Sequence, residues 1–252
     1  MPKASFRFTT NPFFNPTTHT LWGLESLIRW HHPRRGNISP SVFIPIAEDI
    51  GVIRDIGRWV MREACKQMQG WASRYPELNL HLSVNVSARE LKDQQFVTEL
   101  ESILEESGFP ANHLQIEVTE NVFLHGPELV GKILEEVRLL GVQIALDDFG
   151  TGYSSLGYID RYQIDAIKID RSFVMRMLTQ KRTLAIVQSI LGLGQALDVK
   201  IVAEGVETQA QLNMLKSMGR PYIQGYLLAR PAEPKNIAEL LATLAKSHSV
   251  KK

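Results

Sequence analysis

Short runs of apolar and β-branched residues alternate along the chain with longer amphipathic stretches that begin and end at turn residues. The short runs predict β-strands and the longer stretches predict helices, so the pattern indicates an alternating β/α chain. One strand is expected within residues 6–13. The other expected strands cover residues 21–29, 80–86, 114–119, 142–147, 166–169, 199–203 and 222–228.

Turn residues mark the ends of the helices between these strands. Pro127 and Gly141 bracket a helix over residues 128–140, the usual placement of proline at a start and glycine at an end. Gly108 and Gly219 end two further helices in the same way.

The spacing of these units predicts the fold. A strand with its helix takes about 30 residues, so 252 residues hold about eight units, the number in a TIM-like (β/α)8 barrel. A doubly wound open sheet is the alternative. We expect a single domain over residues 1–252, with a core of about 8–240 and flexible ends at 1–7 and 247–252.

The amino-acid composition limits the cellular environment and the partners that we expect for this chain. With 44% hydrophobic and 22% charged residues and a net charge of +1, the chain can bury a core but carries no positive field for a nucleic-acid polymer. No membrane-length apolar run or signal peptide is evident. Cys65 is the single cysteine, which excludes an internal disulfide, and its helix over residues 59–71 favours a buried structural thiol. We therefore expect a cytoplasmic protein.

Polar side chains gather where the predicted strands end. In a barrel, the carboxyl ends of the strands and the following loops form the active face. One isolated acid there would be taken for a solvated strand end or a helix cap, but recurrence at strand after strand points to a site. The residues are Glu25, Asn85, Glu117, Glu120, Asp147, Asp148, Lys168, Asp170, Glu204 and Gln224.

Acids brought together in this way repel one another unless a cation neutralises them. Oxygen ligands without cysteine or histidine at ligand spacing favour Mg²⁺ or Mn²⁺ over Zn²⁺. The adjacent pair Asp147 and Asp148 could serve two ions at once, and Lys168 adds a positive charge for a phosphate. Glu120 could instead be a supporting or capping group, and Asp170, which precedes a helix from Arg171, is expected to be an N-cap.

Two local features need separate interpretations. Residues 147–155 carry two glycines directly beside the acids, which predicts a shaped loop with a structural turn as the alternative. Adjacent His31 and His32 point in different directions on an extended chain, so we interpret them as loop structure and not as a metal site.

Seven motifs together resemble the EAL-domain family of cyclic-di-GMP phosphodiesterases over about residues 8–234. The motifs are ESLIRW (25–30), NVS (85–87), EVTE (117–120), DDFGTGYSS (147–155), KID (168–170), AEGVE (203–207) and QGY (224–226). The resemblance implies a modified TIM barrel whose first strand is antiparallel to the others. It also implies hydrolysis of cyclic-di-GMP to linear pGpG with two Mg²⁺ or Mn²⁺ ions, and inhibition by Ca²⁺.

The resemblance also assigns roles to single residues. Glu25, Asn85, Glu117 and Asp147 would bind one metal, and Asp147 with Asp148 the second. Lys168 and Glu204 would position or activate the attacking water. Arg29 would contact the substrate phosphate, and Gln224 and Asn11 the substrate. Glu120 and Glu207 would brace the 147–155 loop, with Asp170 in support. A homodimer, and sensory or cyclase-type domains in a longer protein, are typical of the family.

Two positions depart from the family pattern. Ser26 replaces the alanine of the signature tripeptide, but it alternates away from Glu25 on a strand, so the ligand is retained. Asn11 replaces a glutamine, and its amide is one methylene shorter, which should alter substrate affinity.

Two other functions are left open by the sequence. One is a non-hydrolytic receptor or scaffold that binds cyclic-di-GMP through the same barrel, which loss of a metal-ligating acid would favour; none is lost. The other is an unrelated Mg²⁺-dependent barrel lyase or enolase-type enzyme, whose base and ligand layout the motifs do not match.

Overall fold

The computed structural model describes residues 5–18, 20–124, 126–150 and 156–249. All strands in these residues belong to one sheet of nine. They are β1 (Ser5–Phe14), β2 (Leu21–His32), β3 (Gly36–Ile38), β4 (His81–Asn85), β5 (Leu114–Thr119), β6 (Gln143–Phe149), β7 (Ala166–Ile169), β8 (Lys200–Ala203) and β9 (Tyr222–Gln224).

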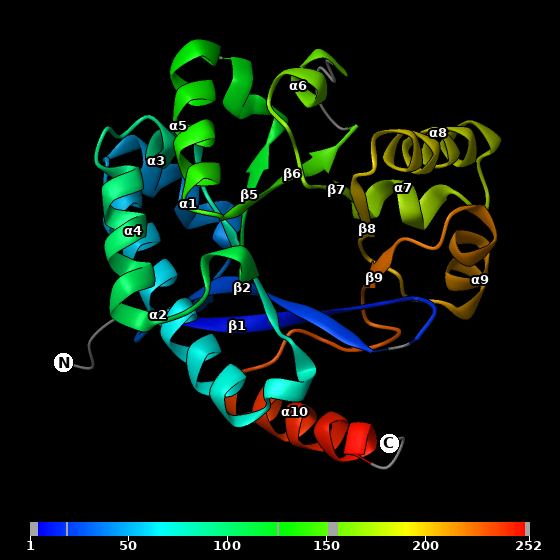
Figure 1. Ribbon diagram of the computed structural model, residues 1–252, viewed down its shortest axis with the longest axis horizontal. Coiled ribbons are helices and arrows are strands. Elements are labelled where there is room, and N and C mark those ends of the chain that lie inside the picture. The colour runs from blue at the N-terminus through cyan, green and yellow to red at the C-terminus, as the bar shows by residue number, and fades with distance from the viewer. Residues whose placement is uncertain (1–4, 19, 125, 151–155, 250–252) are drawn as a thin grey trace.

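The sheet closes on itself. β1 pairs with both β2 and β9, and β3 pairs with β2 alone, so the other eight strands form a barrel (Figure 1). From β2 through β4 to β9 neighbouring barrel strands are parallel, whereas β1 is antiparallel to both of its neighbours. The predicted TIM-like barrel with an antiparallel first strand is therefore confirmed, and the open sheet is excluded.

Helices surround the barrel, with α2, α4 and α5 on one side, α7, α8 and α9 on the other, and α10 beside β1 (Figure 1). The α-helices of the described residues are α1 (Pro40–Asp49), α2 (Ile53–Arg74), α3 (Ala88–Leu91), α4 (Phe96–Ser107), α5 (Pro127–Leu139), α6 (Leu156–Arg161), α7 (Arg171–Arg176), α8 (Lys181–Leu197), α9 (Gln209–Met218) and α10 (Pro234–Ser249). The 3-10 helices are η1 (Pro76–Leu78), η2 (Ala111–His113) and η3 (Glu120–Leu124). None of the helices in this part of the chain has the length and apolarity that a bilayer crossing requires.

The core lies between strands and helices, as the alternating pattern predicts. The parallel strands β5 and β7 are almost wholly buried, and amphipathic helices cover the barrel with one apolar face. On α2 this face includes Val60, Ala64 and Met68. Cys65 is fully buried among them, and burial raises the pKa of its thiol to about 12. The predicted structural thiol is confirmed.

The amino-terminal strands are longer than predicted. β1 begins at Ser5, so residues 5–7 are paired in the sheet instead of flexible, and Phe6 packs on Trp30 and Phe43. β2 continues to His32 and forms a hairpin with β3. His31 and His32 therefore lie in a strand, not in a loop. The interpretation as loop structure was wrong because aromatic packing of Trp30 extends the strand beyond the barrel.

The carboxyl-terminal strand is shorter than predicted, and the last helix is longer. β9 ends at Gln224, and residues 226–228 form a turn. The chain turns at Gly225, which has a φ of 155° and on which a side chain would overlap the backbone of Val206. Val206 donates to the Gln224 carbonyl and accepts from Leu227, so the loop after β8 ends the strand. α10 continues to Ser249, although residues 247–249 were predicted to be flexible.

Aromatic rings cross the base of the barrel, at the amino-terminal ends of the parallel strands. Trp22 stacks on His81 with ring centroids 4.1 Å apart, and His81 stacks on His113 at 4.6 Å. The Lys200 ammonium lies 4.9 Å from the Trp22 ring centroid. Burial, then the positive neighbours His113 and Lys200, lowers the pKa of His81 to about 4, so this ring is neutral at physiological pH.

Candidate active site

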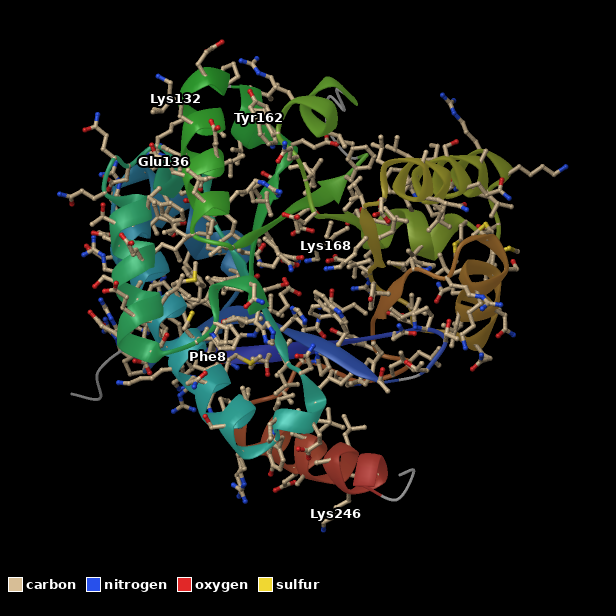
Figure 2. All side chains as sticks on the ribbon, viewed as in Figure 1. Phe8, Lys132, Glu136, Tyr162, Lys168 and Lys246 are labelled. Atoms are coloured by element: carbon tan, nitrogen blue, oxygen red, sulfur yellow. The ribbon has the colours of Figure 1, made fainter. Side chains whose placement is uncertain are left out.

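The predicted site residues converge at the opposite end of the barrel. Most come from the carboxyl end of a strand or the position just after it, whereas Glu25 lies within the long strand β2, and alternation along the strands turns these side chains inward. Glu25 comes from β2, Asn85 from β4, Glu117 from β5, Asp147 and Asp148 from β6, Lys168 from β7, Glu204 follows β8, and Gln224 ends β9. Figure 2 labels Lys168 in the middle of the barrel.

Lys168 is the centre of this cluster. Its Nζ lies 2.6 Å from Glu204 Oε1, 2.7 Å from Glu117 Oε2, 3.4 Å from Asp147 Oδ1 and 3.5 Å from Glu25 Oε1. Burial alone would favour a neutral amine, but the surrounding carboxylates outweigh it and raise the pKa of Lys168 well above its usual value. The residue is therefore a permanent buried cation.

Glu25 is held from three sides. Asn85 donates its Nδ2 hydrogen to Oε1 at 2.9 Å, and Gln224 donates to Oε2 at 2.7 Å. Burial disfavours the charged form, but the Lys168 ammonium and these two amides together overcome it and lower the pKa of Glu25. The carboxylate is thus ionised and fixed in direction. Because Asn85 donates through Nδ2, its Oδ1 is the atom that it can offer to a cation.

Three of the other acids, Glu117, Asp148 and Glu204, resist ionisation. Burial, followed by repulsion from Glu25 and Asp147, raises the pKa of Glu117 well above its usual value in spite of Lys168. Burial also raises the pKa of Glu204 to about 8 and, with repulsion from Asp147, that of Asp148 to about 6. One ammonium is therefore too little charge for five acids.

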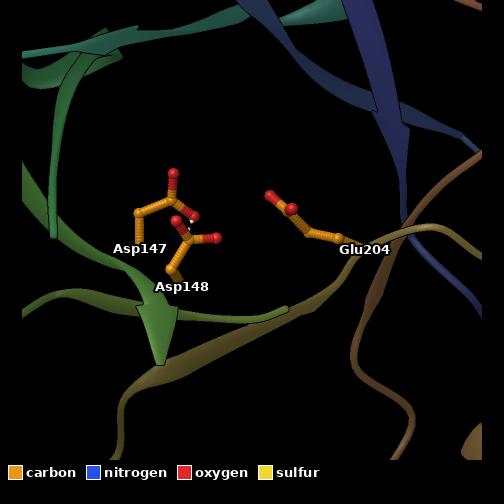
Figure 3. Close-up of side chains that lie close together, drawn as sticks. All are labelled: Asp147, Asp148 and Glu204. Carbon is orange, nitrogen blue, oxygen red and sulfur yellow. Dashed lines mark hydrogen bonds between the residues drawn. The ribbon is translucent and has the colours of Figure 1, made fainter. Parts of the chain in front are cut away.

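Asp147 and Asp148 direct their carboxyl groups to the same space. Adjacent residues on a regular strand point to opposite faces, but Asp148 has a φ of 54°, and its amide donates to Asp147 Oδ1 at 2.9 Å. Carboxylate oxygens of Asp147, Asp148 and Glu204 lie within 4.8 Å of one another, and Figure 3 shows the three side chains facing a common space. An unfavourable backbone conformation at a charged pair is typical of a functional site.

This donor set fits divalent metal ions. Glu25, Glu117, Asp147, Asp148 and Glu204 carry five negative charges when ionised, and Lys168 carries one positive charge, which leaves four negative charges. Two divalent ions would balance them. All donors are carboxylate or amide oxygens, which suit hard ions such as Mg²⁺ and Mn²⁺.

Two of the predicted substrate residues, Asn11 and Arg29, lie on β1 and β2, and the third, Gln224, ends β9. Asn11 is opposite Glu25 in the strand register, and its Oδ1 is buried without a hydrogen-bond partner. Its carbonyl oxygen accepts a long hydrogen bond, 3.5 Å, from Gln224. Arg29 lies four residues beyond Glu25 on the same strand face, and its Nη1 donates to the Ile28 carbonyl. Burial lowers the pKa of Arg29, and the negative charge of Glu25 opposes this shift.

The predicted bracing residues make three different contacts. Glu120 accepts a hydrogen bond from the backbone of Gly150, 3.2 Å away. Asp170 is the N-cap of α7 and accepts from the Ser172 amide. Glu207 forms an ion pair with Arg171 at 2.7 Å. Residues 151–155 of the predicted loop lie outside the described residues.

Sequence reasoning missed two arginines near the site. The stem of Arg171 lies so close to Gly205 that a side chain there would overlap it, so Arg171 holds the loop that carries Glu204. Arg230 stacks over the half-exposed ring of Tyr226, 4.4 Å from its centroid. No periodicity signals either contact, because both depend on how loops fold back on one another.

Fold and site together define a class: TIM-like barrels with an acidic, metal-binding type of site at the carboxyl mouth. A family model described as the EAL domain matches residues 3–231. The chain belongs to the EAL domain family.

Relatives and solved structures agree with this membership. The chain is 41% identical over 223 residues to MucR of Pseudomonas aeruginosa, named a bifunctional diguanylate cyclase/cyclic di-GMP phosphodiesterase, covering 88% of this chain and 32% of MucR. It is 40% identical over 208 residues to the cyclic di-GMP phosphodiesterase PdeR of Escherichia coli, covering 82% of this chain and 31% of PdeR. The chain thus spans about a third of these relatives.

A solved structure of the PaMucR phosphodiesterase in complex with c-di-GMP superposes with a TM-score of 0.88. The two sequences are 38% identical, and the match covers 92% of this chain and 94% of that chain.

Proposed function

We propose that this chain is a metal-dependent phosphodiesterase that hydrolyses cyclic-di-GMP to linear pGpG. The observation that carries the proposal is the convergence of four acids on the single ammonium of Lys168, with Asp148 beside two of them, at the mouth of an EAL barrel. Relatives named as cyclic di-GMP phosphodiesterases support it, as does the similar structure in complex with c-di-GMP.

Two Mg²⁺ or Mn²⁺ ions are the proposed cofactors. Glu25, Asn85, Glu117 and Asp147 would hold one ion, and Asp147 with Asp148 the other. When bound, such ions neutralise the charge of a phosphodiester and lower the pKa of a water molecule. The four negative charges that Lys168 leaves unbalanced at the site support the binding of two divalent ions.

Glu204 and Lys168 are the proposed groups for the attacking water. Glu204 Oε1 is in contact with Lys168 Nζ, and in the metal-free site burial raises the pKa of its carboxyl group to about 8. Bound metal ions would lower this pKa by neutralising the neighbouring acids, so that the ionised carboxylate would orient the attacking water or accept its proton. Lys168 remains charged and would stabilise negative charge that develops on the phosphate oxygens. Glu204 would therefore serve the attacking water, and Lys168 would keep its positive charge throughout the reaction.

Arg29, Asn11 and Gln224 are the proposed substrate contacts. Arg29 would pair with a phosphate of cyclic-di-GMP. The unpartnered Oδ1 of Asn11 accepts a hydrogen bond, so a guanine or ribose donor is the group that it suits. Gln224 is committed to Glu25 and would act mainly by orienting that ligand.

The test is incubation of the purified chain with cyclic-di-GMP and Mg²⁺ or Mn²⁺, followed by chromatography of the nucleotides. Formation of pGpG that EDTA prevents would support the proposal. Binding without turnover under all these conditions would favour a non-hydrolytic receptor or scaffold, and neither binding nor turnover would leave only the barrel.

Three proposals concern the context of the domain. A homodimer, a cytoplasmic location and attachment to sensory or cyclase-type domains are proposed from the family. The relative named an oxygen sensor protein, DosP of Escherichia coli, supports the third: the match is 41% identical and covers 27% of DosP.

A further inference from the structure

Glu90 is a buried acid outside the cluster around Lys168. It lies on α3, directly after β4, and is 8% exposed. Its Oε2 accepts from the backbone amide of Ser87 at 2.9 Å and from the Ser87 hydroxyl at 2.6 Å. In return, Ser87 Oγ accepts from the Glu90 amide at 3.3 Å. The two residues thus form a reciprocal capping box at the first turn after the strand.

No cation compensates this acid within the described residues. Arg54 and Arg58 line the same small cavity, but they pair with Asp93 and Glu99. Burial raises the pKa of Glu90 to about 7. The two hydrogen bonds from Ser87 are therefore the interactions that offset the cost of burying this carboxyl group.

Helix α2 packs directly against the carboxyl group of Glu90. Gly57 faces Glu90 so closely that an added Cβ would overlap Oε1. Gly57 lies in the second turn of α2, inside the helix, where glycine is less favourable than alanine. The lack of a side chain at this position is therefore what lets Glu90 reach Ser87.

The capping box holds the end of a strand that carries a site residue. Asn85, the last residue of β4, donates to Glu25 at 2.9 Å. Val86 donates its backbone amide to the Glu117 carbonyl at 2.9 Å, and Ser87 follows at once. Three successive residues are thus fixed: the first by the site, the second by β5 and the third by Glu90.

We propose that Glu90 is a positioning residue for the metal site, which it serves by fixing the turn through Ser87 so that Asn85 faces Glu25, and that Gly57 is required for this contact. The inference rests on the proposed function. Removal of a residue that orients a metal ligand typically lowers metal affinity by about 10 to 100-fold. We therefore expect substitution of Glu90 to change metal binding, not the activation of the attacking water.

Metal affinity can be measured without turnover by titrating the metal-free chain with Mn²⁺ in a calorimeter. We expect Glu90→Ala to weaken Mn²⁺ binding about tenfold. Glu90→Gln keeps an oxygen that accepts from Ser87, so it should stay within about threefold of wild type. Gly57→Ala pushes on the carboxyl group and should resemble Glu90→Ala. At saturating Mn²⁺ the turnover rate of all three variants should return to that of wild type.

Gly70→Ala is the matched control, because Gly70 lies on the same helix and has open space around it; it should bind Mn²⁺ as wild type does. Circular dichroism identifies any unfolded variant, and the Mn²⁺ affinity of the folded variants then tests the positioning role of Glu90. Folded Glu90→Ala and Gly57→Ala proteins with wild-type Mn²⁺ affinity would overturn the positioning role alone. Failure of the wild type to bind Mn²⁺ would instead overturn the proposed function, and this inference with it.

Discussion

Lys168 and Glu117 form an ion pair 2.7 Å long in which both side chains are almost fully buried. The pair spans from β7 to β5, across the strand that carries Asp147 and Asp148. Removing one partner of such a pair leaves an uncompensated charge in the interior. Lys168 therefore has a structural task in the metal-free protein in addition to its proposed catalytic one.

Lys168→Met should destabilise the metal-free protein. At pH 8 in EDTA we expect the free energy of unfolding to fall by about 3 kcal/mol, because the acids around Lys168 lose their cation. Mn²⁺ should raise the melting temperature more in this variant than in wild type. Chemical denaturation measures the effect, with exposed Lys132→Met as the control. Equal stability of Lys168→Met and wild type in EDTA would contradict the prediction.

The stability of the metal-free protein should fall as the pH rises from about 5 to 8. Glu204 has a pKa of about 8 in the fold against 4.5 as the ordinary value, so in this window the folded protein binds more protons than the unfolded chain. Stability from this group is complete below the lower value and is lost as the pH passes the higher one. Melting temperatures in EDTA test this slope.

Two changes should reduce the slope of the same pH profile. Glu204→Gln removes one of the acids whose pKa is raised in the fold, which also include Asp148 and Glu90, and saturating Mn²⁺ displaces protons from the acids of the site. A profile that rises from pH 5 to 8 in wild type, or one that Glu204→Gln leaves unaltered, would be inconsistent with the assignment.

Glu25→Ala should abolish turnover. The substitution removes a proposed metal ligand and leaves the amides of Asn85 and Gln224 without their acceptor. Formation of pGpG should drop below detection, whereas Glu106→Ala, on the exposed outer face of α4, should keep the wild-type rate. A Glu25→Ala protein with a near-normal rate would remove Glu25 from the mechanism.

Ca²⁺ should support substrate binding with little hydrolysis. It is larger than Mg²⁺, takes more oxygen ligands and tolerates irregular geometry, so it can neutralise the acids without the ordered geometry that the reaction requires. Calorimetry with cyclic-di-GMP in Ca²⁺, beside chromatography of the same samples, measures both quantities. Rapid formation of pGpG in Ca²⁺ alone would argue against two closely spaced metals.

Asn11→Ala should raise the KM for cyclic-di-GMP about tenfold, the effect of losing one hydrogen bond to a charged or strongly polar group, with little change in kcat. Thr10→Val is the matched control, because Thr10 is the neighbouring residue on the opposite face of β1 and its buried hydroxyl also lacks a partner. Steady-state kinetics separate the two parameters. An unchanged KM would show that Asn11 does not contact the substrate.

The fold and most of the site could be predicted because they depend on local pattern. The spacing of the strands indicates the barrel. Acids such as Glu117 and Asp147 lie near the carboxyl ends of strands, which meet at one end of a barrel. The direction of β1 could not be derived from periodicity, because alternation reads the same in both directions; only the family resemblance implied it. Arg171 on Gly205 and the turn at Gly225 were hidden because they depend on contacts between distant loops.

The stacked rings of Trp22, His81 and His113 lie at the end of the barrel opposite the acidic site. Burial lowers the pKa of His81 to about 4, so the central ring of this stack is neutral at neutral pH. Under the proposed function, the substrate would enter and the product would leave at the carboxyl mouth of the barrel, above Lys168. A neighbouring domain or a second subunit placed across this mouth would control substrate binding and product release together.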